Sequence, residues 1–329
     1  MKGVGIRNIK KDIEQLENAG ELLDKNSPTA ARLSLFLLDN LAELMMYKAV
    51  RERFSLDDLL PPSVKPPKYS ANKKRKVLEY FKNKVNFLVS DLRQLDSLQG
   101  HILRLGHRLR NEAYHKGILR EKIIIPITRT YFQTVCALLP ILWTEGYSCA
   151  DYSEVTDFLS KYGQESKSMD QDTLREICQL ILEGRECEAS QLSEVISHDL
   201  VSRIEETIKN IDKLALDIKQ RSAEEILKFI QFQKDTDVEL GIVPSREQCP
   251  RFWEKVDKAF SAFHPKAPLV TLKTLETWKK KAQEIKLEAS HGVIFAKFNE
   301  IDIPFLMIEN CVSQTVFEYD KHIDLLINS

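Results

Sequence analysis

Glycine and proline are scarce in this chain, which holds 11 glycines and 12 prolines among 329 residues. Because these two residues end most helices, their scarcity favours long uninterrupted helices. Long hydrophobic runs are also absent. The longest, Ile123–Ile127 and Ala137–Trp143, each contain a proline and fall far short of the ~20 residues that span a bilayer. The N-terminus has no apolar core of a secretory signal, so we expect a protein that neither enters a membrane nor is secreted.

Paired cysteines and the common motifs of cofactor enzymes are missing as well. The six cysteines form no C-x-x-C pair, which argues against a zinc site or a disulfide framework and favours the reduced cytoplasm. The chain has no H-E-x-x-H, no G-x-x-x-x-G-K and no G-x-S-x-G. We therefore expect neither a metal nor a cofactor.

What is present is charge, and it is unevenly distributed. The formal net charge is −1, but residues 1–150 hold 25 Lys and Arg against 16 Asp and Glu, a balance of +9. The remaining residues hold 23 basic and 33 acidic side chains, a balance of −10. This asymmetry predicts two domains, a basic one at 1–150 and an acidic one at 151–329, with different partners. The acidic part carries no recognisable chemistry; it is expected to bind a protein partner, shield the basic half or regulate it.

The spacing of apolar residues predicts an all-α fold in both parts. In the basic part, Ser27 is a suitable N-cap and Pro28 suits a first helical turn, so a central helix should begin there. Residues 56–70 contain four prolines and should be irregular. Helices are expected at 8–24, 28–54, 72–90, 96–110 and 121–143, and then at 152–161, 172–182, 190–220, 223–235, 248–263, 272–287 and 308–327. Residues 292–295 are expected to form a short strand.

One stretch suggests chemistry. Residues 110–115 have the sequence Arg-Asn-Glu-Ala-Tyr-His, which places a histidine five positions after an arginine near the end of a basic helix. Histidine transfers protons near neutral pH. Arginine is a permanent, planar cation that binds phosphate through two bonds. RNA can be cut without metal when its 2′-hydroxyl attacks the adjacent phosphate, and these two residue types meet the needs of that reaction.

At this point residues 8–145 resemble the HEPN superfamily of ribonucleases, in their R-x4-6-H motif, the polar residue after the arginine and the order of the helices. The resemblance implies that Arg110 and His115 are catalytic, that the product is a 2′,3′-cyclic phosphate and that the protein forms homodimers. On a straight helix, five residues turn the side-chain direction by about 140°. The two side chains therefore meet only if the helix bends or ends between them, or if two copies each contribute a motif.

Four neighbours are candidate supporting residues. Asn111 is expected either to orient a phosphate or to cap the helix, and Tyr114 either to stack on a base or to pack on the bundle. Asp39 and Glu43 lie one turn apart on the central helix. Acidic residues there often line the cleft in HEPN proteins, and the alternative is a solvated stripe with Arg32 as its counter-ion. Glu112 is expected to face solvent.

A cationic surface is expected to bind the RNA backbone, and binding should weaken steeply with salt. Four consecutive cations in a first helical turn oppose the helix dipole, which suggests a compensating purpose. The candidate RNA-binding residues are Lys73, Lys74, Arg75, Lys76, Arg108 and Lys116.

The sequence thus predicts a metal-independent endoribonuclease that acts on RNA as a cytoplasmic homodimer. By family resemblance alone, its role would be that of a toxin or effector in antiviral defence against phage. The alternative is a non-catalytic helical module that binds RNA through the basic face or a protein through the acidic part. The geometry of Arg110 and His115 should discriminate: the nuclease hypothesis fails if the two point into separate buried environments.

Overall fold

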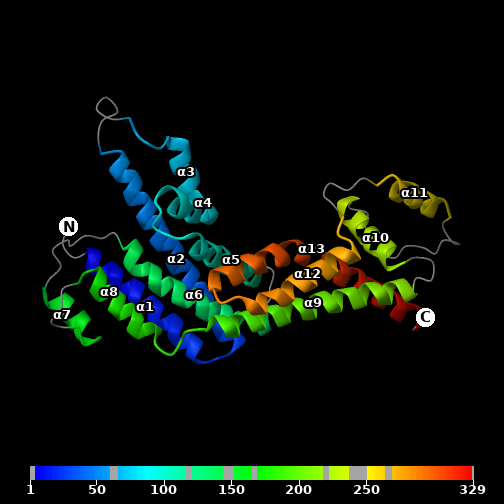
Figure 1. Ribbon diagram of the computed structural model, residues 1–329. Helices are drawn as coiled ribbons and strands as arrows, with labels where there is room; N and C mark the ends of the chain where they lie inside the picture. The colour runs from blue at the N-terminus through cyan, green and yellow to red at the C-terminus, as the bar shows by residue number, and fades with distance from the viewer. Residues whose placement is uncertain are drawn as a thin grey trace. The chain divides into compact units, whose positions relative to one another are not determined.

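The computed structural model describes residues 4–59, 66–115, 120–143, 152–164, 169–217, 222–236, 250–263 and 269–327. Within these ranges the chain is helical and contains no strand, so the all-α prediction is confirmed for the described part. The chain forms two compact units (Figure 1). The first comprises Met1–Val195 with Glu288–Ala296, and the second comprises Ile196–Leu287 with Lys297–Ser329.

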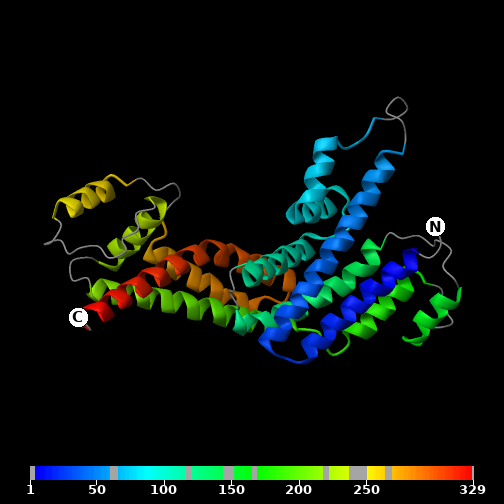
Figure 2. The ribbon, with the colours of Figure 1, turned by 180° about the vertical axis from the view of Figure 1, so that it is seen from behind.

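The first unit is a helical bundle built around one central helix. Helix α2 contacts α1, α6, α5 and the short helices α3 and α4, and α8 packs on α6 and α1. Figure 2 shows α3 and α4 beside the second half of α2. The bounds are α1 Val4–Asp24, α2 Pro28–Asp57, α3 Ala71–Glu79, α4 Phe81–Asn86, α5 Ser97–His115, α6 Glu121–Leu142, α7 Tyr152–Ser160 and α8 Gln171–Leu182.

Helix α2 begins where the sequence predicts. The Ser27 side chain accepts a hydrogen bond from the backbone N–H of Ala30, and Pro28 occupies the first turn. The buried residues of α2 include Leu35, Leu38 and Met46, and they occur on more than one face of the helix. A helix surrounded by others must be apolar on most sides, which is why α2 carries so little amphipathic contrast.

The helix predicted at 72–90 is instead interrupted at Tyr80, whose backbone is extended (φ −110°, ψ 133°). The chain restarts as α4 and ends in a turn of π-helix, Phe87–Asp91. The side chains of Asn83 and Lys84 donate to the carbonyl oxygens of Lys76 and Leu78, which the interruption leaves without helical partners. The break turns Phe81 and Lys84 into the bundle, where both are buried.

Helix α6 is the one described helix that is long and apolar enough to cross a membrane. It is nevertheless a core helix, because 72% of its most apolar 18-residue stretch is buried within the bundle. Its neighbours α2 and α8 cover it, and Ile127, Phe132 and Val135 are fully buried.

The expected boundary at residue 150 does not coincide with the division between the compact units. Helix α8 belongs to the first unit, because its Leu174 and Ile177 are buried in the packing against α6 and α1. The charge asymmetry of the sequence therefore does not mark the edge of the bundle.

The remaining helices are α9 Ala189–Asp217, α10 Ala223–Thr236, α11 Pro250–Ser261, α12 Leu272–Glu284 and α13 His291–Ile327, with a 3-10 turn at Ile285–Leu287. The second unit contains them except for the first residues of α9 and α13, up to Val195 and Ala296, which belong to the first unit. Ion pairs join three of these helices. Arg203 of α9 donates to Asp302 and Glu309 of α13, and Lys279 of α12 pairs with Glu205 of α9.

The short strand predicted at residues 292–295 is wrong, because these residues begin the long helix α13. Ile294, Phe298, Ile301 and Phe305 are buried at helical spacing. The helix also continues through Pro304. Apolar residues spaced every three to four positions bury one face of a helix, whereas a strand would need a pairing partner.

Candidate functional site

Helix α5 carries the Arg110–His115 motif and runs without interruption from Ser97 to His115. The helix does not end between the two residues, and within one copy the ring of Tyr114 lies between their side chains. Tyr114 contacts both of them: the guanidinium carbon of Arg110 lies 5.3 Å from the centre of its ring, and the His115 ring meets it edge-on at 4.9 Å. Arg110 is half-buried and His115 is exposed. The two side chains are therefore not in separate buried environments.

The carboxylate of Asp39 is the centre of the site. It is buried, with 1% of the residue exposed. The alternative in which Asp39 belongs to a solvated stripe on the central helix is therefore wrong. Its Oδ2 accepts a hydrogen bond from Nδ1 of His107 at 2.9 Å, and its Oδ1 accepts one from the phenol of Tyr131 at 3.0 Å. Nε of Arg110 lies 3.6 Å from Oδ2. One buried carboxylate on α2 thus anchors side chains from α5 and α6.

Tyr131 reaches Asp39 because α5 and α6 approach closely at Gly106. A Cβ atom built on Gly106 would lie 2.2 Å from the Tyr131 ring, so that no larger residue fits there without movement. Burial raises the pKa of Tyr131 well above its ordinary value, and the neighbouring charge of Asp39 raises it further. Tyr131 therefore stays protonated and acts as a hydrogen-bond donor.

Glu43 and Arg32 do not form the expected pair on α2. The carboxylate of Glu43 forms an ion pair with the buried ammonium group of Lys84 of α4, at 3.0 Å. Arg32 donates to the carbonyl oxygen of Ala113 at 2.9 Å and lies over the Phe36 ring. Since the carbonyls of the last turn of a helix lack partners within the helix, Arg32 supports the end of α5 that carries the motif.

Asn111 lies within α5 and does not cap it. Its side-chain oxygen accepts a hydrogen bond from Nη1 of Arg110 at 2.8 Å, which helps to fix the direction of the guanidinium. Tyr114 meets the Phe36 ring edge-on but is 62% exposed, so it has both a packing contact and a free surface.

Glu112 is buried, and the expectation that it faces solvent is wrong. It accepts hydrogen bonds from Arg108 at 2.9 Å and from Arg120 at 3.1 Å. Two arginines compensate for the cost of burying one carboxylate. Arg108, a candidate RNA-binding residue, is therefore paired with a buried carboxylate of the protein itself.

The four consecutive cations of α3 fall into two groups. Lys73 pairs with Asp91 at 2.7 Å, and Lys74 pairs with Asp57 and Asp58 at 2.9 and 2.6 Å. These carboxylates supply the compensation that cations in a first helical turn require. Arg75 and Lys76 are exposed, as Lys73 is, but no described carboxylate lies closer than 3.9 Å to either of them. Arg75 has a long contact with the Glu79 carboxylate, at 3.9 Å, and donates a hydrogen bond to the side-chain oxygen of Asn72 at 3.4 Å. Lys116 lies outside the described residues.

Sequence reasoning did not identify His107, Tyr131 or Gly106 as members of the site. The available signal was weak: His107 lies three residues before Arg110, so the two share one face of a helix. Nothing in the sequence pairs that face with Asp39, which is 68 residues away. The motif covers residues 110–115, whereas Gly106 and His107 precede it and Tyr131 lies on the following helix.

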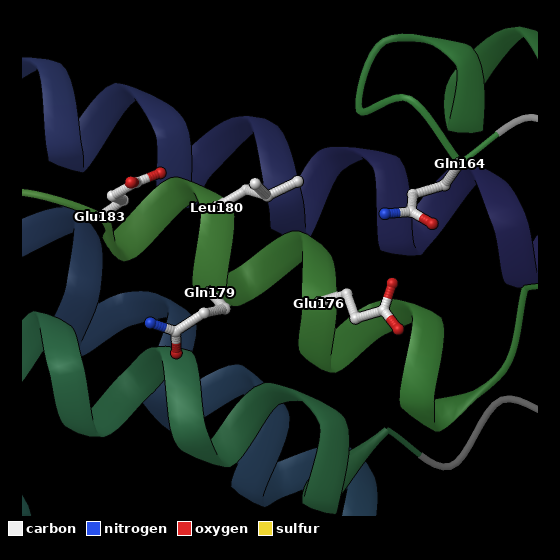
Figure 3. A pocket seen from close by; sticks show the side chains of 5 residues that line it. All are labelled: Gln164, Glu176, Gln179, Leu180 and Glu183. Carbon is white, nitrogen blue, oxygen red and sulfur yellow. The ribbon is translucent and has the colours of Figure 1, made fainter.

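An open hollow beside α8 is distinct from this site (Figure 3). Gln164, Glu176, Gln179, Leu180 and Glu183 line it. None of them belongs to α2 or α5, and the two glutamates would repel a phosphate backbone. Within the described ranges, no group of three or more His, Cys, Asp or Glu side chains is arranged to hold a metal ion.

Comparison of this chain with protein-family models, with curated proteins and with solved structures finds no match.

Proposed function

We propose that this protein is a metal-independent endoribonuclease that uses Arg110 and His115. The observation that supports this proposal is the continuous group formed by Arg110, Tyr114 and His115 at the exposed end of α5. Such a group combines a fixed cation, an aromatic surface and a proton-transferring imidazole, which are the parts that cleavage through the 2′-hydroxyl requires.

The guanidinium of Arg110 is held in place from two sides. Its Nε lies 3.6 Å from the Asp39 carboxylate, and its Nη1 donates to Asn111. No described residue bonds its Nη2, which remains available for a phosphate oxygen. A preorganised cation stabilises the charge that develops on the phosphorus oxygens without first having to reorganise.

The exposed ring of Tyr114 offers a surface on which a base of single-stranded RNA can stack, and the edge of the ring contacts His115. In the proposed homodimer, in which two copies each contribute a motif, His115 of one copy moves a proton and Arg110 of the other binds the phosphate. The proposed products are a 2′,3′-cyclic phosphate and a 5′-hydroxyl end.

The proposal extends to a cytoplasmic homodimer that acts as a toxin or effector in antiviral defence. This part rests on the resemblance of residues 8–145 to HEPN ribonucleases and on no feature of the site. Likewise, the role proposed for residues 151–329, regulation or binding of a protein partner, rests on their excess of acidic residues.

The deciding experiment is cleavage of RNA by the wild type, Arg110→Ala and His115→Ala in the presence of EDTA. We expect the wild type to cut and both variants to lose cutting by at least 10²-fold. Matched controls are Arg175→Ala and His198→Ala, which remove an exposed arginine of α8 and an exposed histidine of α9.

Equal cutting by the wild type and His115→Ala would contradict the assignment of His115 as a catalytic residue. Loss of wild-type cutting in EDTA would indicate a metal-dependent enzyme instead. RNA binding that is unaccompanied by cleavage under any condition would support the alternative, a non-catalytic helical module.

A further inference from the structure

His107 occupies a defined position between three helices, although it lies outside the motif. Its Nδ1 donates to both carboxylate oxygens of Asp39, at 2.9 and 3.2 Å. Its ring stacks on Phe81 of α4, with the two centres 3.8 Å apart and the planes inclined by 7°. The hydrogen bond fixes the rotation of the ring and the stacking fixes its plane. The histidine is thus held in one orientation.

This arrangement leaves the second ring nitrogen available. A carboxylate accepts a hydrogen bond and cannot donate one, so Nδ1 carries the proton and Nε2 of a neutral ring carries the lone pair. No described residue bonds Nε2, and Nε2 is not among the buried side-chain atoms that lack partners. With 24% of the side chain exposed, Nε2 faces solvent.

Arg110 follows His107 by three residues on α5 and shares its carboxylate, because both contact Oδ2 of Asp39. The next turn places Tyr114 against the guanidinium, and His115 against Tyr114. One continuous series of contacts therefore runs along α5, with a histidine on each side of Arg110.

Cleavage through the 2′-hydroxyl requires two proton transfers. As the bond from the 2′-oxygen to phosphorus forms, a base removes the hydroxyl proton. As the bond from phosphorus to the 5′-oxygen breaks, an acid gives that oxygen a proton. A single histidine would have to serve both oxygens, which lie on opposite sides of the phosphorus. On one straight helix His107 and His115 lie about 12 Å apart along the axis, so the second histidine at a given Arg110 must come from the other copy of the proposed homodimer.

We propose that His107 is a second catalytic histidine, the general base whose Nε2 takes the proton from the 2′-hydroxyl. Asp39 is its positioning residue: it stabilises the imidazolium that forms, as a carboxylate does in other acid–base dyads. His115, contributed by the other copy of the proposed homodimer, is then the general acid. This inference rests on the nuclease function proposed above.

The charged and titratable groups around His107 come from every helix packed against it. They are Asp39 and Glu43 of α2, Lys84 of α4, Arg104 and Arg110 of α5 and Tyr131 of α6. Glu43 and Lys84 neutralise each other, and Tyr131 stays protonated. The groups left in direct contact with His107 and its carboxylate are therefore Asp39 and Arg110.

The informative variant is His107→Asn, because the asparagine amide can donate to Asp39 from the position of Nδ1 but has no counterpart of Nε2. We expect a 10²- to 10⁴-fold loss of cleavage, unchanged thermal unfolding, and loss of the acidic limb of the pH–rate profile. His101→Asn, on the same helix, is the matched control and should keep the wild-type rate and profile.

A modified substrate separates the two histidines. In RNA with sulfur in place of the bridging 5′-oxygen, the leaving thiolate needs no proton. This substrate should restore cleavage by His115→Ala but not by His107→Asn. Restoration of His107→Asn instead would overturn its assignment as the base.

A purely structural histidine gives a different pattern: His107→Asn would cut at the wild-type rate, while His107→Ala would be inactive and less stable. That result would overturn the inference and leave the nuclease proposal intact. Absence of cleavage by the wild type would instead remove the function on which both rest.

Discussion

The phenol of Tyr131 donates a hydrogen bond to the buried carboxylate of Asp39 across 3.0 Å, and 92 residues separate the two in the sequence. The same carboxylate binds His107 and lies beside Arg110. A donor from α6 therefore fixes the group that positions both side chains of α5. The site depends on the packing of three helices rather than on the motif alone.

Replacing Tyr131 with phenylalanine should lower the free energy of unfolding by roughly 1.5–3 kcal/mol. The change removes a hydrogen bond to a charged group and leaves Asp39 with one donor fewer in a buried place. Urea unfolding measures the loss. Tyr47→Phe, on an exposed tyrosine of α2, should change stability by less than about 0.5 kcal/mol. Equal effects of the two substitutions would contradict the role given to the phenol.

Gly106→Ala should destabilise the protein by about 1–3 kcal/mol through overpacking. The added methyl group would lie 2.2 Å from the Tyr131 ring, which is fully buried and cannot move aside freely. Alanine in a helix gains up to about 1 kcal/mol over glycine, so the clash must outweigh that gain.

The matched control for this prediction is Gly100→Ala on the same helix. There the new atom would meet a Val89 methyl group at 3.1 Å and the flexible Arg104 guanidinium at 3.3 Å. The substitution should be close to neutral. If Gly106→Ala proved as stable as Gly100→Ala, the close approach of α5 and α6 would be refuted.

The sequence predicts elements whose signals are local, and α2 is the clearest case. Ser27 and Pro28 specify its start through contacts within one turn. The break at Tyr80 is not predictable in this way, because the apolar pattern from Val77 to Leu88 continues through it. The break arises from tertiary packing, in which Phe81 stacks on His107 and Lys84 reaches Glu43.

The site shows the same division. Arg110 and His115 lie five positions apart and form a recognisable spacing, and Asp39 is a candidate through its position on the central helix. His107 is identified as part of the site only by its hydrogen bond to Asp39. Glu112 can be buried only because Arg108 and Arg120 both bind it. The sequence does not show which distant partners allow a polar residue to be buried.

Asp57 should make the stability of the bundle sensitive to acid. Its bond to Lys74, together with the backbone N–H groups of Lys68 and Tyr69, lowers its pKa to about 2. A carboxylate whose pKa is lowered on folding contributes stability above its ordinary pKa, near 4, and loses that contribution as the pH falls towards 2.

The measurement for Asp57 is the thermal unfolding midpoint of the wild type and Asp57→Asn between pH 5 and pH 2.5. We expect the wild type to be more stable at pH 5 and the difference to shrink steadily below pH 4. A difference that stays constant over this range would show that the charge of Asp57 does not stabilise the fold.

The last prediction concerns Arg75 and Lys76 of α3, for which the described residues supply no carboxylate closer than 3.9 Å. If Arg75 and Lys76 contact RNA phosphates, each contributes about 0.7 to the slope of log K against log salt for a single strand. Arg75→Gln with Lys76→Gln should therefore lower that slope by about 1.4 and weaken binding most at low salt. Lys255→Gln with Lys258→Gln removes the same charge from exposed positions of α11 and should leave the slope unchanged. Filter binding over a range of salt concentrations measures both. Equal losses in the two double variants would mean that RNA responds to net charge alone, and not to a surface at α3.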